Sequence, residues 1–117
     1  MIIFKVQGSA SEPYTTSFYQ TESKIVAQCS CPAGKMGQLC KHRLCILQGD
    51  TKSIVSSNSS DIQDVLSWIR GTDVEDALRQ FQEAEKNFAE AKIQLGVIKR
   101  RLAHALLSGS RNRTLEE

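Results

Sequence analysis

Alternation of apolar and polar side chains marks the amino-terminal part of the chain. Ile2, Phe4 and Val6 recur at every second position, which is the period of a half-buried strand. The β-branched and aromatic run from Tyr14 to Gln20 predicts a second strand, and segment 24–29 predicts a third after a polar turn. The short connections between these strands favour an antiparallel meander.

The spacing of apolar residues becomes helical after the third strand. A helix is predicted from about Cys40 to Gln48, because Gly49 is a good carboxy-terminal helix signal. The serine-rich segment 51–60 predicts a linker, within which Ile54 and Val55 suit a short edge strand.

Two further helices are predicted beyond the linker. A capping box of Ser60 with Gln63 introduces apolar residues at helical spacing over 62–69. A second box, Thr72 with Glu75, opens a helix of about 36 residues that would span on the order of 50 Å at 1.5 Å per residue.

Apolar residues of the long helix repeat every seven positions. The a positions carry large side chains, and the d positions carry mostly alanine. These residues are Val74, Phe81, Phe88, Leu95 and Leu102 at a, and Ala77, Ala84, Ala91, Ile98 and Ala105 at d. Heptads that stay in register predict a coiled-coil seam, and alanine lets the paired helices approach closely.

Charge adds an orientation to this seam. The formal net charge of +2 is too small to indicate nucleic acid by itself, but residues 61–90 carry eight acidic and three basic side chains, and residues 91–113 carry six basic and no acidic ones. Two long helices laid antiparallel would set the acidic half of each against the basic half of the other. We therefore expect a homodimer through the long helix. The alternative is packing on the chain's own helix at 62–69, which covers only part of the seam.

Composition limits the size of the core. A chain of 117 residues with 40% apolar and 6% aromatic residues has the length of one domain, alone or with a helical extension, and it can bury only a modest core. Small domains of this kind often need a staple such as a metal ion.

Three of the four cysteines and one of the two histidines lie close together in the sequence. Cys29 and Cys31 form one pair, Cys40 and His42 form a second, and a proline and two glycines between them let the chain double back. Four sulfur and nitrogen donors suit tetrahedral Zn²⁺. Because four protein ligands leave no position for an activated water, we expect one structural zinc ion.

Two alternatives to this ligand set stay open on the sequence alone. A disulfide between Cys29 and Cys31 would close a tight, strained ring, and a reducing compartment disfavours it. Cys45 lies three residues after His42 on the same helical face, so a four-cysteine site with His42 free fits the spacing. Cys45 also suits a small buried apolar residue, because its neighbours are leucine and isoleucine.

The order C-x-C-x(8)-C-x-H resembles the SWIM zinc finger, a family of small modules found in bacterial proteins, transposase-related proteins and chromatin remodellers. All four ligand positions are matched, at Cys29, Cys31, Cys40 and His42, and the resemblance covers about 25–48. It implies a β-hairpin followed by a helix, with one ligand pair at the hairpin end and the other at the helix start. It also implies a role in binding DNA or protein.

Two basic groups are candidates for contact with nucleic acid. They are Lys35, Lys41 and Arg43 around the predicted metal site, and Lys99, Arg100 and Arg101 near the end of the long helix. The first group has a second interpretation, because Zn²⁺ with three thiolates is an anionic complex that nearby cations stabilise.

These patterns predict an α+β fold, with a small zinc-pinned antiparallel β-meander plus helix followed by a helix-turn-long-helix arm. The expected parts are a zinc-binding module at 1–50, a linker at 51–60, a helical hairpin or arm at 61–108 and a disordered tail at 109–117.

The expected function is that of a non-enzymatic zinc-binding interaction module that binds DNA or a protein partner and self-associates. The alternative is a protein–protein adaptor with no nucleic-acid binding. An enzyme is disfavoured because no catalytic set is visible and the metal site is saturated. No run resembles a signal peptide or membrane span, so we expect a cytoplasmic protein with no membrane partner and no small-molecule substrate.

Overall fold

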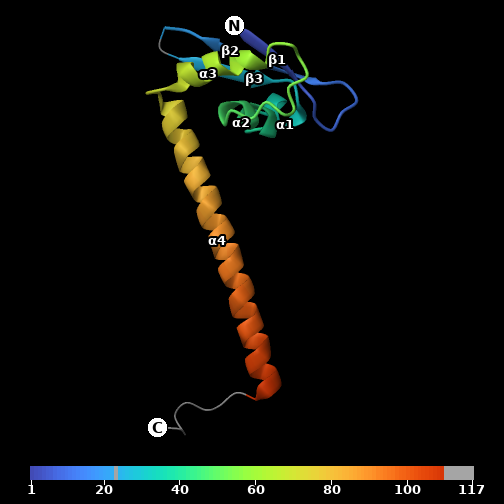
Figure 1. Cartoon of the computed structure of the whole chain (residues 1–117), viewed down its shortest axis with the longest axis vertical. Coiled ribbons are helices and arrows are strands. Elements are labelled where there is room, and N and C mark those ends of the chain that lie inside the picture. The colour runs from blue at the N-terminus through green and yellow to red at the C-terminus, as the bar shows by residue number, and fades with distance from the viewer. Residues whose placement is uncertain (23, 110–117) are drawn as a thin grey trace. The chain divides into compact units, whose positions relative to one another are not determined.

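Three antiparallel strands form the sheet of this protein. The computed structural model describes residues 1–22 and 24–109. β1 (Ile2–Val6), β2 (Tyr14–Gln20) and β3 (Ile25–Cys29) are neighbours in chain order (Figure 1). The predicted meander is confirmed.

In the described part of the chain, five helical segments accompany the sheet, and three of them match predicted helices closely. The segments are α1 (Pro32–Lys35), α2 (Lys41–Leu47), the 3₁₀ turn η1 (Ser59–Asp61), α3 (Ile62–Ile69) and α4 (Asp73–Ser108). The α+β class is therefore confirmed. The four-residue helix α1 has no counterpart among the predicted helices.

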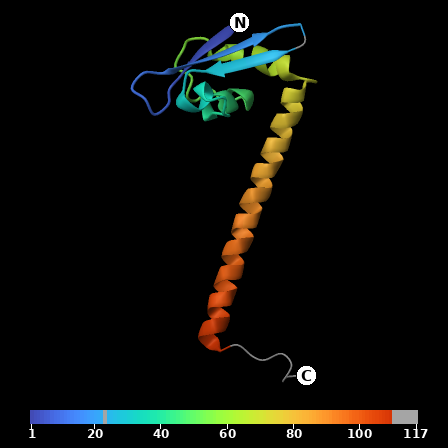
Figure 2. The same ribbon diagram turned by 180° about the vertical axis from the view of Figure 1, so that it is seen from behind.

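The hydrophobic core lies on one face of the sheet. Phe4 and Phe18 are fully buried, and their rings meet edge to face with centroids 6.1 Å apart. Ile46 of α2 and Ile62 and Val65 of α3 pack against them. Figure 2, the view from behind, shows β2 and β3 in front of α3. Alternate residues of β1 and β2 are thus buried because one face of each strand packs into this core, as their period of two predicts.

The segment after α2 lies along β1. The N–H of Val55 donates to the carbonyl of Lys5 at 2.8 Å, and Ile54 forms an isolated β-bridge with Val6. In place of the short edge strand predicted at Ile54 and Val55, the structure has a single bridge.

The start of α3 differs from its prediction. Asp61 is the N-cap residue of α3, and no side chain caps this helix end, so the capping box of Ser60 with Gln63 is wrong. The physical reason is that η1 precedes α3 and places Ser60 inside a 3₁₀ turn.

The chain divides into two compact units, residues 1–78 and residues from 79 onward. The first unit contains α3, whose Ile62 and Val65 belong to the sheet core and whose Ile69 is also buried. The division into module, linker and arm stays a prediction, and the tail expected at 109–117 lies, apart from Gly109, outside the described residues. No helix in the described part of the chain has the length and apolarity that a membrane span requires.

Candidate metal centre

Strand β3 and the starts of two helices bring together four side chains that could bind a metal ion. Cys29 ends β3, Cys31 is the N-cap of α1, Cys40 is the N-cap of α2, and His42 lies in the first turn of α2. All four residues are buried, and their ligand atoms lie within 4.8 Å of one another. The cluster can therefore hold a metal ion.

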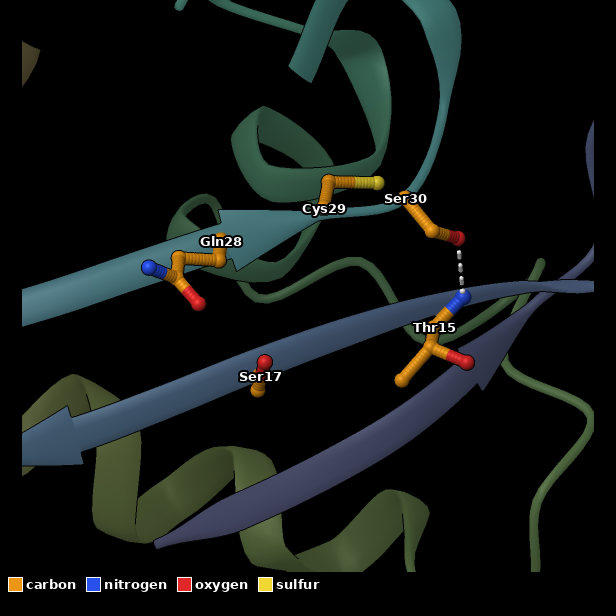
Figure 3. Close-up of a pocket in the computed structure, with 5 residues that line it drawn as sticks. All are labelled: Thr15, Ser17, Gln28, Cys29 and Ser30. Carbon is orange, nitrogen blue, oxygen red and sulfur yellow. Dashed lines mark hydrogen bonds between the residues drawn. The ribbon is translucent and has the colours of Figure 1, made fainter. Parts of the chain in front are cut away.

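Ser30 fixes the chain between the first two cysteines. Its N–H donates to the carbonyl of Thr15 at 3.0 Å, and its hydroxyl accepts from the N–H of Thr15 at 2.9 Å (Figure 3). Because alternate residues of an extended chain point to opposite sides, Cys29 and Cys31 are both directed away from the side taken by Ser30. Because both cysteines lie on the same side of the chain, the C-x-C spacing can present two sulfur atoms to one ion.

Two of the cysteines cap the helices that follow them. Sγ of Cys31 accepts from the N–H of Gly34 at 3.3 Å, and Sγ of Cys40 accepts from the N–H of Arg43 at 3.5 Å. Cys40 has an extended backbone, with ψ of 154°, whereas His42 is helical. Side chains two residues apart on one helix point about 200° apart around its axis and could not converge on one ion. Because Cys40 is extended and precedes the helix, its side chain can point toward the same ion as His42.

His42 turns one ring nitrogen toward the sulfur atoms. Its Nδ1 lies 3.7 Å from Sγ of Cys29, close to the roughly 3.6 Å expected between sulfur and nitrogen on tetrahedral Zn²⁺. The other nitrogen, Nε2, is buried without a hydrogen-bond partner among the described residues. The ring also contacts Tyr14, with centroids 4.9 Å apart. The orientation of the imidazole fits ligation of a metal through Nδ1.

Cys45 lies outside the cluster. It is half-buried in α2 and does not join the four residues whose donor atoms converge, among the residues that the structure describes. The geometry therefore favours His42 over Cys45 as the fourth donor. The interpretation of Cys45 as a small buried apolar residue holds only in part, because the residue is half-buried.

Close packing around the cluster depends on two glycines. A Cβ at Gly34 would lie 2.4 Å from the carbonyl oxygen of Cys29, and a Cβ at Gly8 would lie 2.7 Å from Nε2 of His42. Gly34 thus allows α1 to fold against the end of β3, and Gly8 allows the β1–β2 connection to pack on the histidine ring. On the sequence alone, Gly34 is one of the two glycines that let the chain double back between the ligand pairs.

Thr16 is a further residue of the site that sequence reasoning did not single out. It is fully buried, and its hydroxyl lies 3.4 Å from Sγ of Cys29. A signal was present, because the strand period puts this polar residue on the same face as Phe18, which is in the core.

Burial and hydrogen bonding shift the acidities of the donors in different directions. Burial raises the pKa of the Cys29 thiol, although the Thr16 hydroxyl and the N–H of Cys31 oppose the change. Burial acts the same way on Cys40, but hydrogen bonds from the backbone and side chain of Arg43, together with those from the side chains of Cys31 and Cys29, outweigh it and lower the pKa of that thiol. Burial, together with the charge of Lys41, lowers the pKa of His42, so its imidazole stays neutral and able to bind a metal at a lower pH than usual.

The side chain of Arg43 donates hydrogen bonds at the cluster of cysteines and histidine. Its Nε donates to Sγ of Cys40 at 3.3 Å, one terminal nitrogen donates to the carbonyl of Ala27 at 3.3 Å, and the other donates to the carbonyl of Gln38. The guanidinium therefore joins the edge of β3, the loop before α2 and a thiol. Of the two interpretations of this residue, the contacts favour stabilisation of the thiolate over contact with phosphate.

The other basic candidates are exposed and belong to different parts of the chain. Lys35 and Lys41 lie at the end of α1 and the start of α2, in the first compact unit. Lys99, Arg100 and Arg101 lie on α4, in the second unit.

We expect Arg43→Gln to weaken zinc binding about 10- to 100-fold, the usual cost of losing a hydrogen-bond partner of a ligand. The variant removes the side-chain donor to Cys40, so the pKa of this thiol should rise and protons should compete better with the metal. The pH at which zinc is half released should move upward, as measured by competition with a chromophoric chelator at several pH values. Lys35→Gln, which removes an exposed positive charge at the end of α1, is the matched control. Equal losses in both variants would contradict the role given to the guanidinium.

Comparison with known proteins finds no family model, no curated protein and no solved structure that matches this chain. The geometry of the cluster and the order of its potential ligands are therefore the features that indicate a function.

Proposed function

We propose that this chain is a non-enzymatic zinc-binding interaction module with one structural Zn²⁺. The observation that carries this proposal is the convergence of four buried sulfur and nitrogen donors within 4.8 Å of one another. Such a set suits tetrahedral zinc, and its four protein ligands leave no coordination position for a substrate or an activated water. The ion would stabilise the folded chain, because the four donors converge, and can bind one ion together, only in the folded state.

The placement of the donors supports a SWIM-type module. The first pair of ligands lies at the end of a β-hairpin, at Cys29 and Cys31, and the second pair lies at the start of a helix, at Cys40 and His42. This is the arrangement that the resemblance implies. The short helix α1 between the pairs is what folds the intervening chain back on itself.

Self-association through α4 is the second part of the proposal. This helix is 36 residues long and buries none of its residues. An exposed apolar stripe of this kind commonly marks an interaction surface.

Native mass spectrometry tests the zinc and the self-association together. We expect one zinc ion per chain and a dimeric assembly. A chain that takes up no zinc from a buffered solution would overturn the first part, and a monomer at tens of micromolar would overturn the second.

DNA binding is the second candidate for the target, alongside a protein partner. The exposure of Lys35 and Lys41 beside the metal cluster favours it, whereas the engagement of Arg43 takes one cation out of the predicted set. Fluorescence anisotropy with a labelled duplex at increasing salt separates the two. Phosphate contacts predict an affinity that falls steeply with salt and falls further in Lys35→Gln/Lys41→Gln. Lys52→Gln is the control for loss of charge alone, and an absence of binding at low salt would leave the protein-adaptor function.

A further inference from the structure

The seam of α4 exposes large apolar side chains from Phe88 to Leu102. Phe88 is 72% exposed, Leu95 and Ile98 are each 53% exposed, and Leu102 is 60% exposed. The apolar face of α3, the one intrachain partner predicted for this seam, is already used: Ile62 and Val65 are buried in the sheet core. The seam is therefore available to a partner helix.

We infer that α4 pairs antiparallel with α4 of a second copy of this chain, centred near Phe88 and Ala91. The inference rests on the proposed self-association and adds an orientation and a register. Its basis is the match between large and small residues along the seam and the match between charges that flank it.

The packing match concerns the a and d positions. In an antiparallel pair an a residue faces a d residue of the other helix, so every a residue of this seam meets an alanine or Ile98. A parallel pair would stack a on a and d on d, which alternates crowded phenylalanine layers with empty alanine layers and departs from the even density of protein interiors. The three central layers are Phe88 with Ala91 of the second copy, Leu95 with Ala84 of the second copy, and Phe81 with Ile98 of the second copy, each formed twice by symmetry.

The charge match concerns the e positions, which face each other in an antiparallel pair. In the register given by the core layers, Glu85 lies two residues, or about 3 Å along the axis, from Lys92 of the second copy. Symmetry forms this pair twice. A parallel pair instead sets g against e, which places Gln80 beside Glu85 and Asn87 beside Lys92 and forms no pair of opposite charge. Exposed ion pairs are weak, so they select the orientation more than they supply the stability.

The seam itself is tested by Phe88→Asp with Ile93→Asp as its matched control. Ile93 lies on the same helix and is 68% exposed, close to the 72% of Phe88, but it occupies an f position outside the seam. By sedimentation equilibrium at tens of micromolar, we expect the wild type and Ile93→Asp to be dimers and Phe88→Asp to be a monomer. Circular dichroism of each variant checks that the helix persists. A dimeric Phe88→Asp with a native helical signal would overturn the inference.

The charge pairs are tested by a reversal and its rescue. Glu85→Lys sets lysine against lysine in the antiparallel pair and should weaken dimerisation roughly fivefold or more at low salt. The double variant Glu85→Lys/Lys92→Glu recreates both pairs with the signs exchanged and should restore the wild-type dissociation constant. An antiparallel pair requires this rescue, and a double variant as weak as the single one would overturn the register.

Photo-crosslinking determines the orientation directly in the full-length protein. A photoreactive amino acid in place of Leu95 should crosslink to the region of Ala84 of the second copy, identified by mass spectrometry of the peptides. Crosslinks to the region of Leu95 of the second copy would show a parallel pair and overturn the inference while the proposed self-association stands. A wild-type monomer would overturn both, and neither result would change the zinc stoichiometry.

Discussion

We expect Cys40→Ser to lower zinc affinity by on the order of 100-fold or more, since it removes one of four ligands from a site whose metal contributes about 10–16 kcal/mol in comparable modules. Cys40 also caps α2 through its sulfur atom. Serine is itself a good N-cap residue, so the start of α2 should survive and the loss should report the metal bond alone. Competition with a chelator of known affinity measures the effect.

Cys45→Ser is the matched control for this prediction. Cys45 lies in the same helix as His42 but outside the convergent cluster. The control should retain one zinc ion per chain with an affinity close to that of the wild type. A large loss of zinc in Cys45→Ser, with Cys40→Ser unaffected, would show that the ligand set is wrong.

Removal of zinc is expected to unfold the first compact unit and to leave most of the helical signal of α4. The sheet core of that unit contains only six fully buried apolar residues, which is little for a domain of this size. The cysteine cluster forms a separate small core of its own. Without the ion, no covalent or ionic link would connect the three buried thiols of this second core.

Two signals separate the units in this experiment. Trp68 is the only tryptophan of the chain and packs against the sheet core, so its fluorescence reports the first unit. Far-UV circular dichroism is dominated by the 36 residues of α4. We expect a chelator to shift the emission of Trp68 to longer wavelength with a smaller loss of helical signal. Unchanged Trp68 emission in the zinc-free protein would contradict a structural role for the metal.

The regular elements follow from local patterns that the sequence displays openly. The alternation of Ile2, Phe4 and Val6 is what one buried face of a strand requires. Gly49 ends α2 in a left-handed conformation, with φ of 81°, as a carboxy-terminal glycine does. The long helix is equally visible, because neither proline nor a cap interrupts its heptads.

The rest depends on contacts between residues distant in sequence. The four-residue α1 is too short to show a helical period, and only Pro32 at its first position marks it. The two interpretations of Arg43 could not be separated without knowing that the carbonyls of Ala27 and Gln38 lie within its reach. Gly8 lies far from His42 in the chain, so nothing local indicates that the two are in contact.

We expect three thiolates and one imidazole to close a tetrahedral zinc site, and X-ray absorption at the zinc edge of the metal-loaded full-length protein tests this most directly. The geometry of Cys29, Cys31, Cys40 and His42 predicts three sulfur neighbours at about 2.3 Å and one nitrogen neighbour at about 2.0 Å. Four sulfur neighbours would make Cys45 a ligand in place of His42. A shell with fewer than three sulfur atoms, completed by oxygen from water, would contradict a closed structural site.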